Sequence, residues 1–317
     1  MKLAKWQGLG NDYLIVEEAA LPSPLTPQAI DLLCDRHLGV GADGILVRGQ
    51  PTGAVPGAVA RMRVFNPDGG EPEMCGNGIR IFARYLVRSG AVAEPEFVVE
   101  TLAGAIRPRL LDDGTVRVDM GRARFSGSHI DPSRVAGGLS LGDGTPVCPT
   151  DDIVGSIIQV GGDDYRFTFV DVGNPHCVIL VEDPGTFDVA GVGAHVECHP
   201  LFPNRVNVEF VSVRSDGSVD MRVWERGVGE TLACGTGATA VGAACVRMGL
   251  TISPTRVRLP GGDLTIEVEE EAGTGEPEEG RGAGPRVVMT GPAEEVFSCR
   301  LSDDLLRRLG WPAASDD

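Results

Sequence analysis

Two cysteines occupy the same short pattern, Cys-Gly-x-Gly, at Cys75–Gly78 and Cys234–Gly237. A helical pattern begins directly after each cysteine, and a glycine fifteen residues later, Gly90 or Gly249, predicts where the helix ends. A thiol at a helix N-terminus faces unpaired backbone N–H groups and the positive end of the macrodipole, which lower a cysteine pKa and also hold anions. Two such thiols, one in each half of the chain, predict a site with a proton-transfer group on either side of a substrate.

The two cysteines belong to a longer internal repeat. Phe65–Glu71 leads into the first cysteine as Trp224–Glu230 leads into the second, and the cysteines are 234 − 75 = 159 residues apart. Gly10-Asn11 is likewise repeated as Gly173-Asn174, at an offset of 174 − 11 = 163. Solenoid repeats have periods of roughly 20–50 residues, so this repeat indicates a duplicated domain. We expect the two equivalent helix N-termini to line an interdomain cleft that takes a small molecule.

Composition narrows the class of protein. The 317 residues are enough for two domains of about 150 each, and 42% hydrophobic content supports two cores. A net charge of −17 disfavours binding to the phosphates of nucleic acid. The N-terminus lacks the apolar segment of a signal peptide, and no apolar run approaches the ~20 residues of a membrane span. We therefore expect a cytoplasmic protein with no membrane or nucleic-acid partner.

The elements that must position the cysteines alternate along both halves. Apolar runs predict strands at 3–6, 14–16, 45–47, 62–65, 97–99, 116–120, 167–172, 178–181, 206–213, 221–224, 257–259 and 264–268. A further helix is predicted over Pro27–Arg36, with Thr26 as its N-cap. The helix over Gly235–Met248 is apolar on all sides, so it should be buried and closely approached by its neighbours.

Three segments are predicted to lie outside these elements. Pro132–Asp143 reads as an interdomain connection, and the tail from Ser315 as a frayed end. Glu269–Gly284 is acidic and rich in glycine and proline, which favours a solvated hairpin insertion.

Three other patterns could carry chemistry, and we interpret each as structural. Gly39–Gly44 matches the dinucleotide pattern G-x-G-x-x-G, but a helix precedes it and a strand follows, the reverse of the fingerprint. His195, Cys198 and His199 have no partner cluster elsewhere, so we expect no metal site. The eight cysteines form no Cys-x-x-Cys pair, and those in apolar segments are expected to be inert core thiols: Cys34, Cys177 and Cys245.

Polar residues recur in the glycine- and proline-marked loops near the two cysteines. His176 and the Glu225-Arg226 pair lie in the second copy of the repeat. The asparagines are Asn11, Asn66, Asn77, Asn174 and Asn207. Each alone is typical of a turn. Together with one arginine, around two cysteines, they predict a polar pocket for a zwitterionic ligand.

These motifs in order resemble the diaminopimelate epimerase family. The similarity is carried by Gly8–Asp12, Cys75–Gly78, Gly173–Cys177, Arg205–Asn207, Glu225–Gly227 and Ala233–Gly237, and it covers nearly the whole chain apart from 269–284 and the tail. The resemblance implies cofactor-independent interconversion of LL- and meso-diaminopimelate, on the route to lysine and peptidoglycan. It also implies an α/β (α+β) fold of two pseudo-symmetric domains, each a curved, mainly antiparallel sheet around a central helix. We place the domains at 1–121 with about 298–317, and at 122–297.

The resemblance also implies roles for individual residues. Cys75 and Cys234 would be the acid–base pair, and Glu225 and His176 would tune the thiols. The substrate would be held by Asn11, Asn66, Asn174, Asn207, Glu225 and Arg226, with Gly76, Asn77, Gly235 and Thr236 at the reacting carboxylate. The chain departs from the family at one place, since Gly44 stands where some members carry glutamine, and a side-chain contact there must be absent or replaced.

Other interpretations remain open at this point. Another two-cysteine, cofactor-independent amino-acid racemase or epimerase would share the motifs but not the substrate. A nucleotide-dependent oxidoreductase would use Gly39–Gly44, and a binding-only protein would keep the pocket without turnover. The residues leave the oligomeric state open, with a homodimer as one outcome.

Overall fold

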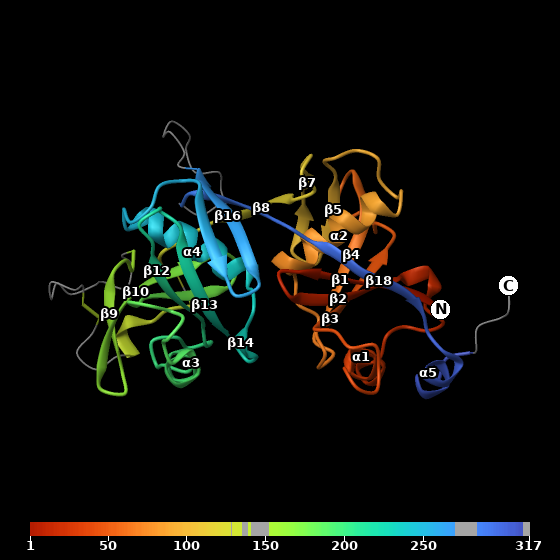
Figure 1. Cartoon of the computed structure of the whole chain (residues 1–317), viewed down its shortest axis with the longest axis horizontal. Coiled ribbons are helices and arrows are strands. Elements are labelled where there is room, and N and C mark those ends of the chain that lie inside the picture. The colour runs from red at the N-terminus through yellow and green to blue at the C-terminus, as the bar shows by residue number, and fades with distance from the viewer. Residues whose placement is uncertain (128, 135–138, 141–151, 270–283, 313–317) are drawn as a thin grey trace. The chain divides into compact units, whose positions relative to one another are not determined.

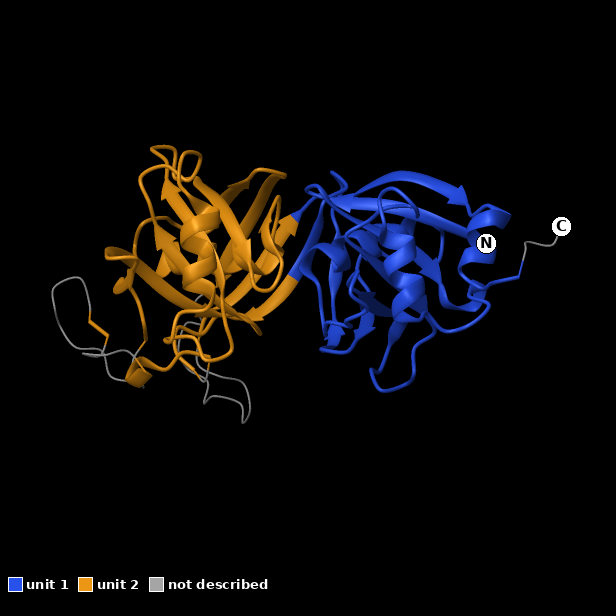
Figure 2. Ribbon diagram, turned by 90° about the horizontal axis from the view of Figure 1, so that it is seen from below, with its two compact units in different colours: residues 1–118, 291–317 blue, residues 119–290 orange. Residues whose placement is uncertain are grey.

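Each cysteine pattern lies in a separate unit of the structure. The computed structural model describes residues 1–127, 129–134, 139–140, 152–269 and 284–312. It divides into unit 1, residues 1–118 with 291–317, and unit 2, residues 119–290 (Figure 2). Cys75 therefore belongs to unit 1 and Cys234 to unit 2.

Unit 1 is a mixed sheet with three α-helices (Figure 1). Its strands are β1 Lys2–Gly8, β2 Asn11–Glu17, β3 Gly44–Gly49, β4 Ala58–Phe65, β5 Val98–Thr101, β6 Gly104–Ile106, β7 Pro108–Leu110 and β18 Glu294–Arg300. Its helices are α1 Pro27–Cys34, α2 Gly76–Arg88 and α5 Asp303–Arg308, with a 3-10 turn at Glu18–Ala20. The sheet order is β18-β1-β2-β3-β4-β5-β6, and neighbours are antiparallel except β2/β3 and β4/β5. Strand β7 is not part of this sheet and pairs instead with β8, Val116–Arg122.

Unit 2 repeats this plan. Its strands are β9 Ser156–Val160, β10 Asp163–Asp171, β11 Pro175–Leu180, β12 Asn207–Val213, β13 Val219–Glu225, β14 Gly229–Thr231, β15 Thr255–Leu259, β16 Gly262–Glu269 and β17 Arg286–Gly291. Its helices are α3 Val189–Glu197 and α4 Gly235–Arg247, with a 3-10 turn at Pro132–Arg134. The order β17-β16-β15-β13-β12-β11-β10-β9, with β14 beside β13, again has two parallel pairs, β11/β12 and β13/β15. The chain enters unit 2 along β8, Val116–Arg122, and leaves it at the end of β17.

Strand register confirms the duplicated fold. In the parallel pair β2/β3, Tyr13 lies opposite Gly44, and in β11/β12, His176 lies opposite Asn207. Both members of the second pair follow the first by 163 residues, since 176 − 13 and 207 − 44 give the same offset. Residues of β2 and β3 thus have definite counterparts in β11 and β12.

A helix packs against the sheet of each unit. α2 packs on β1, β2 and β4, and its inward residues Ile79, Phe82 and Leu86 are fully buried. α4 packs on β10, β11, β12, β15 and β16. A Cβ on Gly242 would come within 2.4 Å of Cγ2 of Ile266, so the small residues of α4 let the strands approach as predicted. The mainly antiparallel sheets around central helices match the predicted fold class.

The predicted elements are present, with some differences at their ends. α1 begins at Pro27 with Thr26 as N-cap, but it ends at Cys34 rather than Arg36. The cause is Asp35, whose Oδ1 accepts the backbone N–H groups of His37 and Leu38 and closes a turn. The helix over Val189–Glu197 was not predicted, because its two glycines and short apolar run resemble a loop.

The division between units also differs from the predicted one. Units change at 118/119 and 290/291, rather than at 121/122 and 297/298. A division at 297/298 would cut β18, which pairs along its length with β1 of unit 1. Glu269 and Arg286 pair at the ends of β16 and β17, as a hairpin requires. Residues 270–283 between them, most of the predicted connection after Arg134, and the tail from Ser315 lie outside the described residues.

Candidate functional site

Cys75 is the N-cap of α2. Its Sγ accepts the backbone N–H of Gly78 at 3.3 Å, and its own backbone is extended. Cys75 is half-buried. A side chain on Gly78 would crowd Cβ of Cys75 at 3.2 Å and Cδ2 of Leu46 at 3.1 Å, which explains the glycine three residues after the thiol. The thiol is thus aimed at helix-end N–H groups, as predicted.

Cys234 caps α4 in the same way, with the N–H of Gly237 at 3.4 Å from its Sγ. Unlike Cys75 it is buried, with 6% of its surface exposed. Burial, together with the charges of Glu225 and Glu209, raises the pKa of Cys234 well above its usual value, although the helix N–H acts against this rise. The sequence predicted a lowered pKa here, and that expectation is wrong for the described conformation. Cys234 is held as a thiol, the form that donates a proton.

Carboxylates and an imidazole lie behind Cys234. Nδ1 of His176 is 2.6 Å from Oε1 of Glu209, and both side chains are fully buried. Nε2 of His176 is 3.0 Å from Oδ1 of Asn174, whose Nδ2 donates to Oγ1 of Thr236 at 3.4 Å. The Thr236 hydroxyl lies 3.5 Å from the Sγ of Cys234. A chain of contacts therefore leads from His176 through Asn174 and Thr236 to the thiol of Cys234.

Glu225 adds a second carboxylate beside Cys234. Burial raises the pKa of Glu225, while hydrogen bonds from Thr231 and Cys234 act against that rise. The Thr231 hydroxyl donates to Oε1 of Glu225 at 2.5 Å. Glu225 is therefore a carboxyl with a raised pKa next to a buried thiol, which makes it a candidate proton-exchange partner of Cys234.

Residues on β2 and α2 surround Cys75. The hydroxyl of Tyr13, which follows the predicted Asn11-Asp12, lies 3.3 Å from the Sγ of Cys75. The guanidinium of Arg80 is fully buried and donates to Oδ1 of Asn77 at 2.8 Å and to the carbonyl of Gly76 at 2.9 Å. Burial lowers the pKa of Arg80 to about 10, and the charge of Cys75 opposes that change. The predicted Gly76-Asn77 turn is therefore braced by a buried cation.

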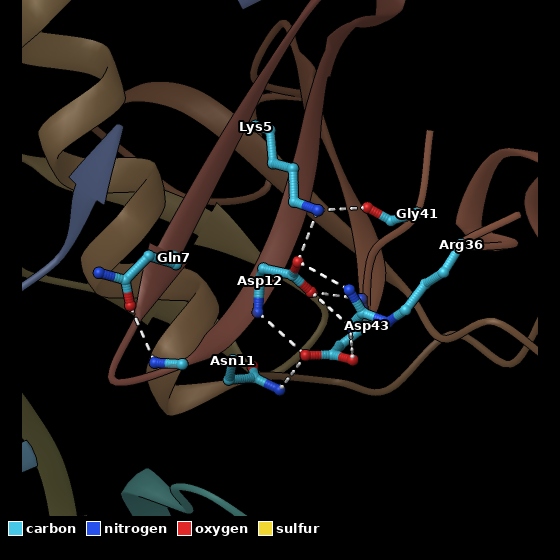
Figure 3. A network of polar contacts seen from close by, with 8 residues as sticks. Lys5, Gln7, Asn11, Asp12, Arg36, Gly41 and Asp43 are labelled. Carbon is cyan, nitrogen blue, oxygen red and sulfur yellow. Dashed lines mark hydrogen bonds and ion pairs between the residues drawn. The ribbon is translucent and has the colours of Figure 1, made fainter. Parts of the chain in front are cut away.

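Asn11 is oriented by a network of charged side chains (Figure 3). Its Nδ2 donates to Oδ2 of Asp43 at 3.4 Å, and its Oδ1 is buried without a partner among the described residues. Asp43 also accepts the backbone N–H of Asp12 and pairs with Arg36. An amide fixed through its nitrogen presents its oxygen, which is the group that accepts from an ammonium.

Arg226 and Asn207 lie at the ends of neighbouring strands in unit 2. Oδ1 of Asn207 accepts the backbone N–H of Arg226 at 2.9 Å, and its Nδ2 donates to the carbonyl of Pro175 at 3.0 Å. Asn207 is thus a brace that holds the Arg226 backbone. The Arg226 guanidinium donates to the carbonyl of Asn204 at 3.2 Å.

Asn66 directly follows β4. Its backbone closes a turn, with its N–H on the carbonyl of Gly70 and its carbonyl on the N–H of Gly69. In the repeat Asn66 is the counterpart of Glu225, since 225 − 66 equals the cysteine offset of 159. A polar residue therefore follows the same strand in both units.

Unit 2 brings together Cys234, Thr236, Asn174, His176 and Glu225, and unit 1 places Asn77 in the first turn of the helix that Cys75 caps. The sequence analysis missed Tyr13, Arg80, Glu209 and Asp43. A signal existed for two of them, since Glu209 interrupts the apolar strand 206–213 and Arg80 interrupts the apolar face of α2.

The glycine-rich segment and the core cysteines have structural surroundings. Gly39–Gly44 connects a helix to a strand, and a Cβ on Gly39 would lie 1.8 Å from the Leu32 carbonyl oxygen. The three predicted core thiols are buried, and burial raises the pKa of Cys34 and of Cys245 to about 12. Among the described residues, no helix is long and apolar enough to cross a membrane, and no group of three or more His, Cys, Asp or Glu could hold a metal ion.

Comparison with known proteins adds a sequence relationship. The model of the family described as diaminopimelate epimerase matches residues 3–126 and 168–296. The diaminopimelate epimerase of Desulforudis audaxviator is 47% identical over 303 residues, which cover 94% of this chain and 98% of that protein. The diaminopimelate epimerase of Desulfitobacterium hafniense is 42% identical over 315 residues, covering 96% and 100%.

Solved structures share the fold at low identity. A hydroxyproline epimerase from Agrobacterium vitis superposes with a TM-score of 0.61 at 15% identity, covering 94% of this chain and 91% of that one. A PhzF-family phenazine biosynthesis protein from Bacillus anthracis gives a TM-score of 0.61 at 15% identity, covering 95% and 98%. These likenesses establish the architecture alone.

Proposed function

The chain belongs to the diaminopimelate epimerase family, and from this premise we propose that it interconverts LL- and meso-2,6-diaminopimelate with Cys75 and Cys234 as its acid–base pair. The observation that carries the proposal is the pair of equivalent capping thiols. Each unit presents one, with its Sγ on the N–H of a glycine three residues later.

Inversion at Cα needs two groups. One thiolate removes the proton, so the Cα–H bond breaks as an S–H bond forms. The other thiol gives its proton to the opposite face, so that S–H bond breaks as a new Cα–H bond forms. One group alone would return the proton to the face it left. The step is redox-neutral, and the residues of this chain supply both proton carriers.

The carbanion formed between these two transfers needs stabilisation. Its charge spreads onto the α-carboxylate, and helix N-termini are binding sites for carboxylates. We assign that role to the first backbone N–H groups of α2 and α4, at Gly76, Asn77, Gly235 and Thr236. The buried Arg80, which holds Asn77, adds a positive charge behind the first of these ends.

Substrate specificity would come from the polar residues around the thiols. Arg226 suits the distal carboxylate, because a guanidinium binds a carboxylate with two parallel hydrogen bonds. Asn11 presents a buried oxygen suited to an ammonium. Asn66 and Asn174 would complete the set of side chains that bind the substrate. Asn207 would contribute chiefly by holding the backbone of Arg226.

The deciding experiment is incubation of the protein with LL-diaminopimelate in deuterium oxide, with no cofactor added. We expect Cα to acquire deuterium, which NMR measures, and meso-diaminopimelate to form, which chiral chromatography measures. Cys75→Ser and Cys234→Ser should each lower kcat about 10²–10⁴-fold, the range for loss of an acid–base group. Cys299→Ser, on a half-buried thiol of β18, is the matched control and should keep full activity. Normal turnover in either site variant would refute the two-thiol assignment.

The main alternative is an epimerase or racemase for a different amino acid. Lysine, proline and 4-hydroxyproline in the same assay separate the substrates, because they lack the distal carboxylate that Arg226 would bind. Equal turnover of any of them would remove the diaminopimelate assignment and leave the thiol chemistry standing.

Two finer statements belong to the same proposal. We place the enzyme in the cytoplasm, where lysine and peptidoglycan precursors are made, and we include a homodimer as its assembly. Fractionation and light scattering test these two points separately.

A further inference from the structure

Tyr13 and Gly44 are neighbours across two strands, close to the N-cap residue of α2. They lie opposite one another in the parallel strands β2 and β3. A Cβ on residue 44 would come within 2.6 Å of Cε1 of Tyr13 and within 2.6 Å of the carbonyl oxygen of Phe65. The Tyr13 ring therefore occupies the space beside residue 44, and only glycine there leaves room for it. The Tyr13 ring thus takes the space next to residue 44, a position where some members of the family carry glutamine.

The ring brings a hydroxyl to the thiol. Tyr13 is buried, with 5% of its surface exposed, and its hydroxyl lies 3.3 Å from the Sγ of Cys75. The same Sγ accepts the N–H of Gly78 at 3.3 Å. If the Tyr13 hydroxyl is the donor of its contact, the sulfur accepts two hydrogen bonds, an arrangement that favours a negative charge on it.

The repeat shows what stands at this position in unit 2. The counterpart of Tyr13 is His176, and the counterpart of Gly44 is Asn207, by the shared offset of 163 residues. His176 is bound to Glu209 and, through Asn174 and Thr236, lies behind Cys234. Unit 2 therefore supports its cysteine with titratable groups, whereas unit 1 supports its cysteine with a neutral phenol.

We propose that Tyr13 is a positioning residue for Cys75, whose hydroxyl donates a hydrogen bond to the thiolate and holds it in the orientation that takes a proton. The inference rests on the proposed function for its catalytic consequence, but the contact itself can be tested without substrate. In this role the hydroxyl donates a hydrogen bond without transferring its proton, so the proposal adds no further acid or base. The two cysteines are then not equivalent, since one is supported as the base and the other is held as the acid.

A test of this contact must leave the other charged groups near Cys75 unchanged. Arg80 on α2 is the cation whose pKa responds to Cys75. Among the charged side chains on the strands packed against α2, Lys5 pairs with Asp12, Arg63 with Glu71, and Glu295 with Arg88. Strand β7, which also packs on α2, carries Arg109. Replacement of Tyr13 by phenylalanine removes one oxygen and leaves these charges in place.

The experiment is the pH dependence of alkylation of Cys75 by iodoacetamide, followed by mass spectrometry of the Cys75 peptide. A hydrogen bond to a charged acceptor is worth enough to move the midpoint upward by roughly one to two pH units in Tyr13→Phe. Tyr85→Phe is the matched control, since it also removes a hydroxyl from unit 1, one that donates to Glu17 at 2.6 Å. Its midpoint should equal that of the wild type.

The alkylation midpoint of Tyr13→Phe decides whether the proposal stands. An unchanged midpoint in Tyr13→Phe overturns the proposal, and a lowered midpoint also overturns it, because the thiol would then be the donor. If the phenylalanine variant fails to fold, Tyr13→His carries the test. An imidazole there should add a step near pH 6.5 to the Cys75 profile, and a profile without that step counts against the proposal.

Turnover gives a second, separate measure. In Tyr13→Phe we expect kcat for diaminopimelate to fall roughly tenfold to a hundredfold while KM stays near the wild-type value. A protein that alkylates as described but does not epimerise diaminopimelate would refute the proposed function and keep the Tyr13 assignment. If the alkylation profile shifts but kcat stays normal, the contact exists but does not contribute to catalysis, and that part of the proposal is refuted.

Discussion

Asp12→Asn should destabilise unit 1 in a pH-dependent way. Asp12 lies in the network that orients Asn11 (Figure 3), and its side chain is 12% exposed. Its carboxylate is 2.7 Å from the ammonium of Lys5 and accepts both terminal nitrogens of Arg36, at 2.9 and 3.1 Å. Asparagine has nearly the same shape but no charge for these two cations.

The pKa of Asp12 sets the magnitude. Burial alone would raise it, but the hydrogen bonds from Arg36 and Lys5 prevail and lower it from 3.8 to about 2. At 1.36 kcal/mol per pH unit, a difference of about 1.8 units corresponds to about 2.4 kcal/mol of stability. Burial raises the pKa of the neighbouring Asp43, which acts in the opposite sense, so this figure is an upper bound.

The sign follows from the lowered pKa. The contribution of Asp12 is complete above the unfolded-state value of about 3.8 and is lost as the pH falls through about 2. At pH 3 roughly half of it remains. The variant, which has no carboxyl to protonate, should therefore differ most from the wild type at pH 7 and progressively less toward pH 2.

Hydrogen exchange of β2 peptides across a urea series, at pH 7 and pH 3, measures this difference within unit 1. Reading β2 avoids the assumption that both units unfold together. Asp304→Asn is the control, since it removes a carboxylate from an exposed pair with Arg307 in the same unit and should change nothing measurable. The reasoning is refuted if Asp12→Asn costs the same at both pH values, or no more than the control.

Three further predictions concern unit 2. Arg226→Lys should lower kcat/KM for diaminopimelate about tenfold to a hundredfold without improving lysine, measured with both substrates, because an ammonium cannot bind a carboxylate through two parallel hydrogen bonds. Gly242→Ala should lower the free energy of unfolding by about 1–3 kcal/mol in urea, despite the better helix propensity of alanine, and Ile266→Ala, which removes both γ carbons near the added methyl group, should cost less in that variant than in the wild type. Thr231→Val removes a hydrogen bond to Glu225 and should raise the pKa of that carboxyl further. The acid limb of the pH profile of kcat/KM should then move upward by about one pH unit. An acid limb that does not move would exclude a role for the ionisation of Glu225.

Local patterns in the sequence determined the two thiol caps and the helices they begin. A cap depends on a side chain and an N–H three residues later, so the spacing of Cys75 and Gly78 is enough to predict it. The duplication was also readable, because equivalent motifs recur at nearly constant offsets. From these the fold class and the family resemblance followed.

Only the tertiary structure decided what lies behind each thiol. The contacts of Tyr13 with Cys75 and of His176 with Glu209 join residues 62 and 33 positions apart, on elements whose alignment depends on strand register and helix packing. A shift of one residue in register would turn these side chains to the opposite face. The depth of burial, which keeps Cys234 protonated despite its place at a helix end, likewise depends on the packing of a whole unit. The two thiols were therefore visible in the chain, but the difference between their surroundings, a half-buried Cys75 beside Tyr13 and a buried Cys234 beside Glu225, is a property of the fold.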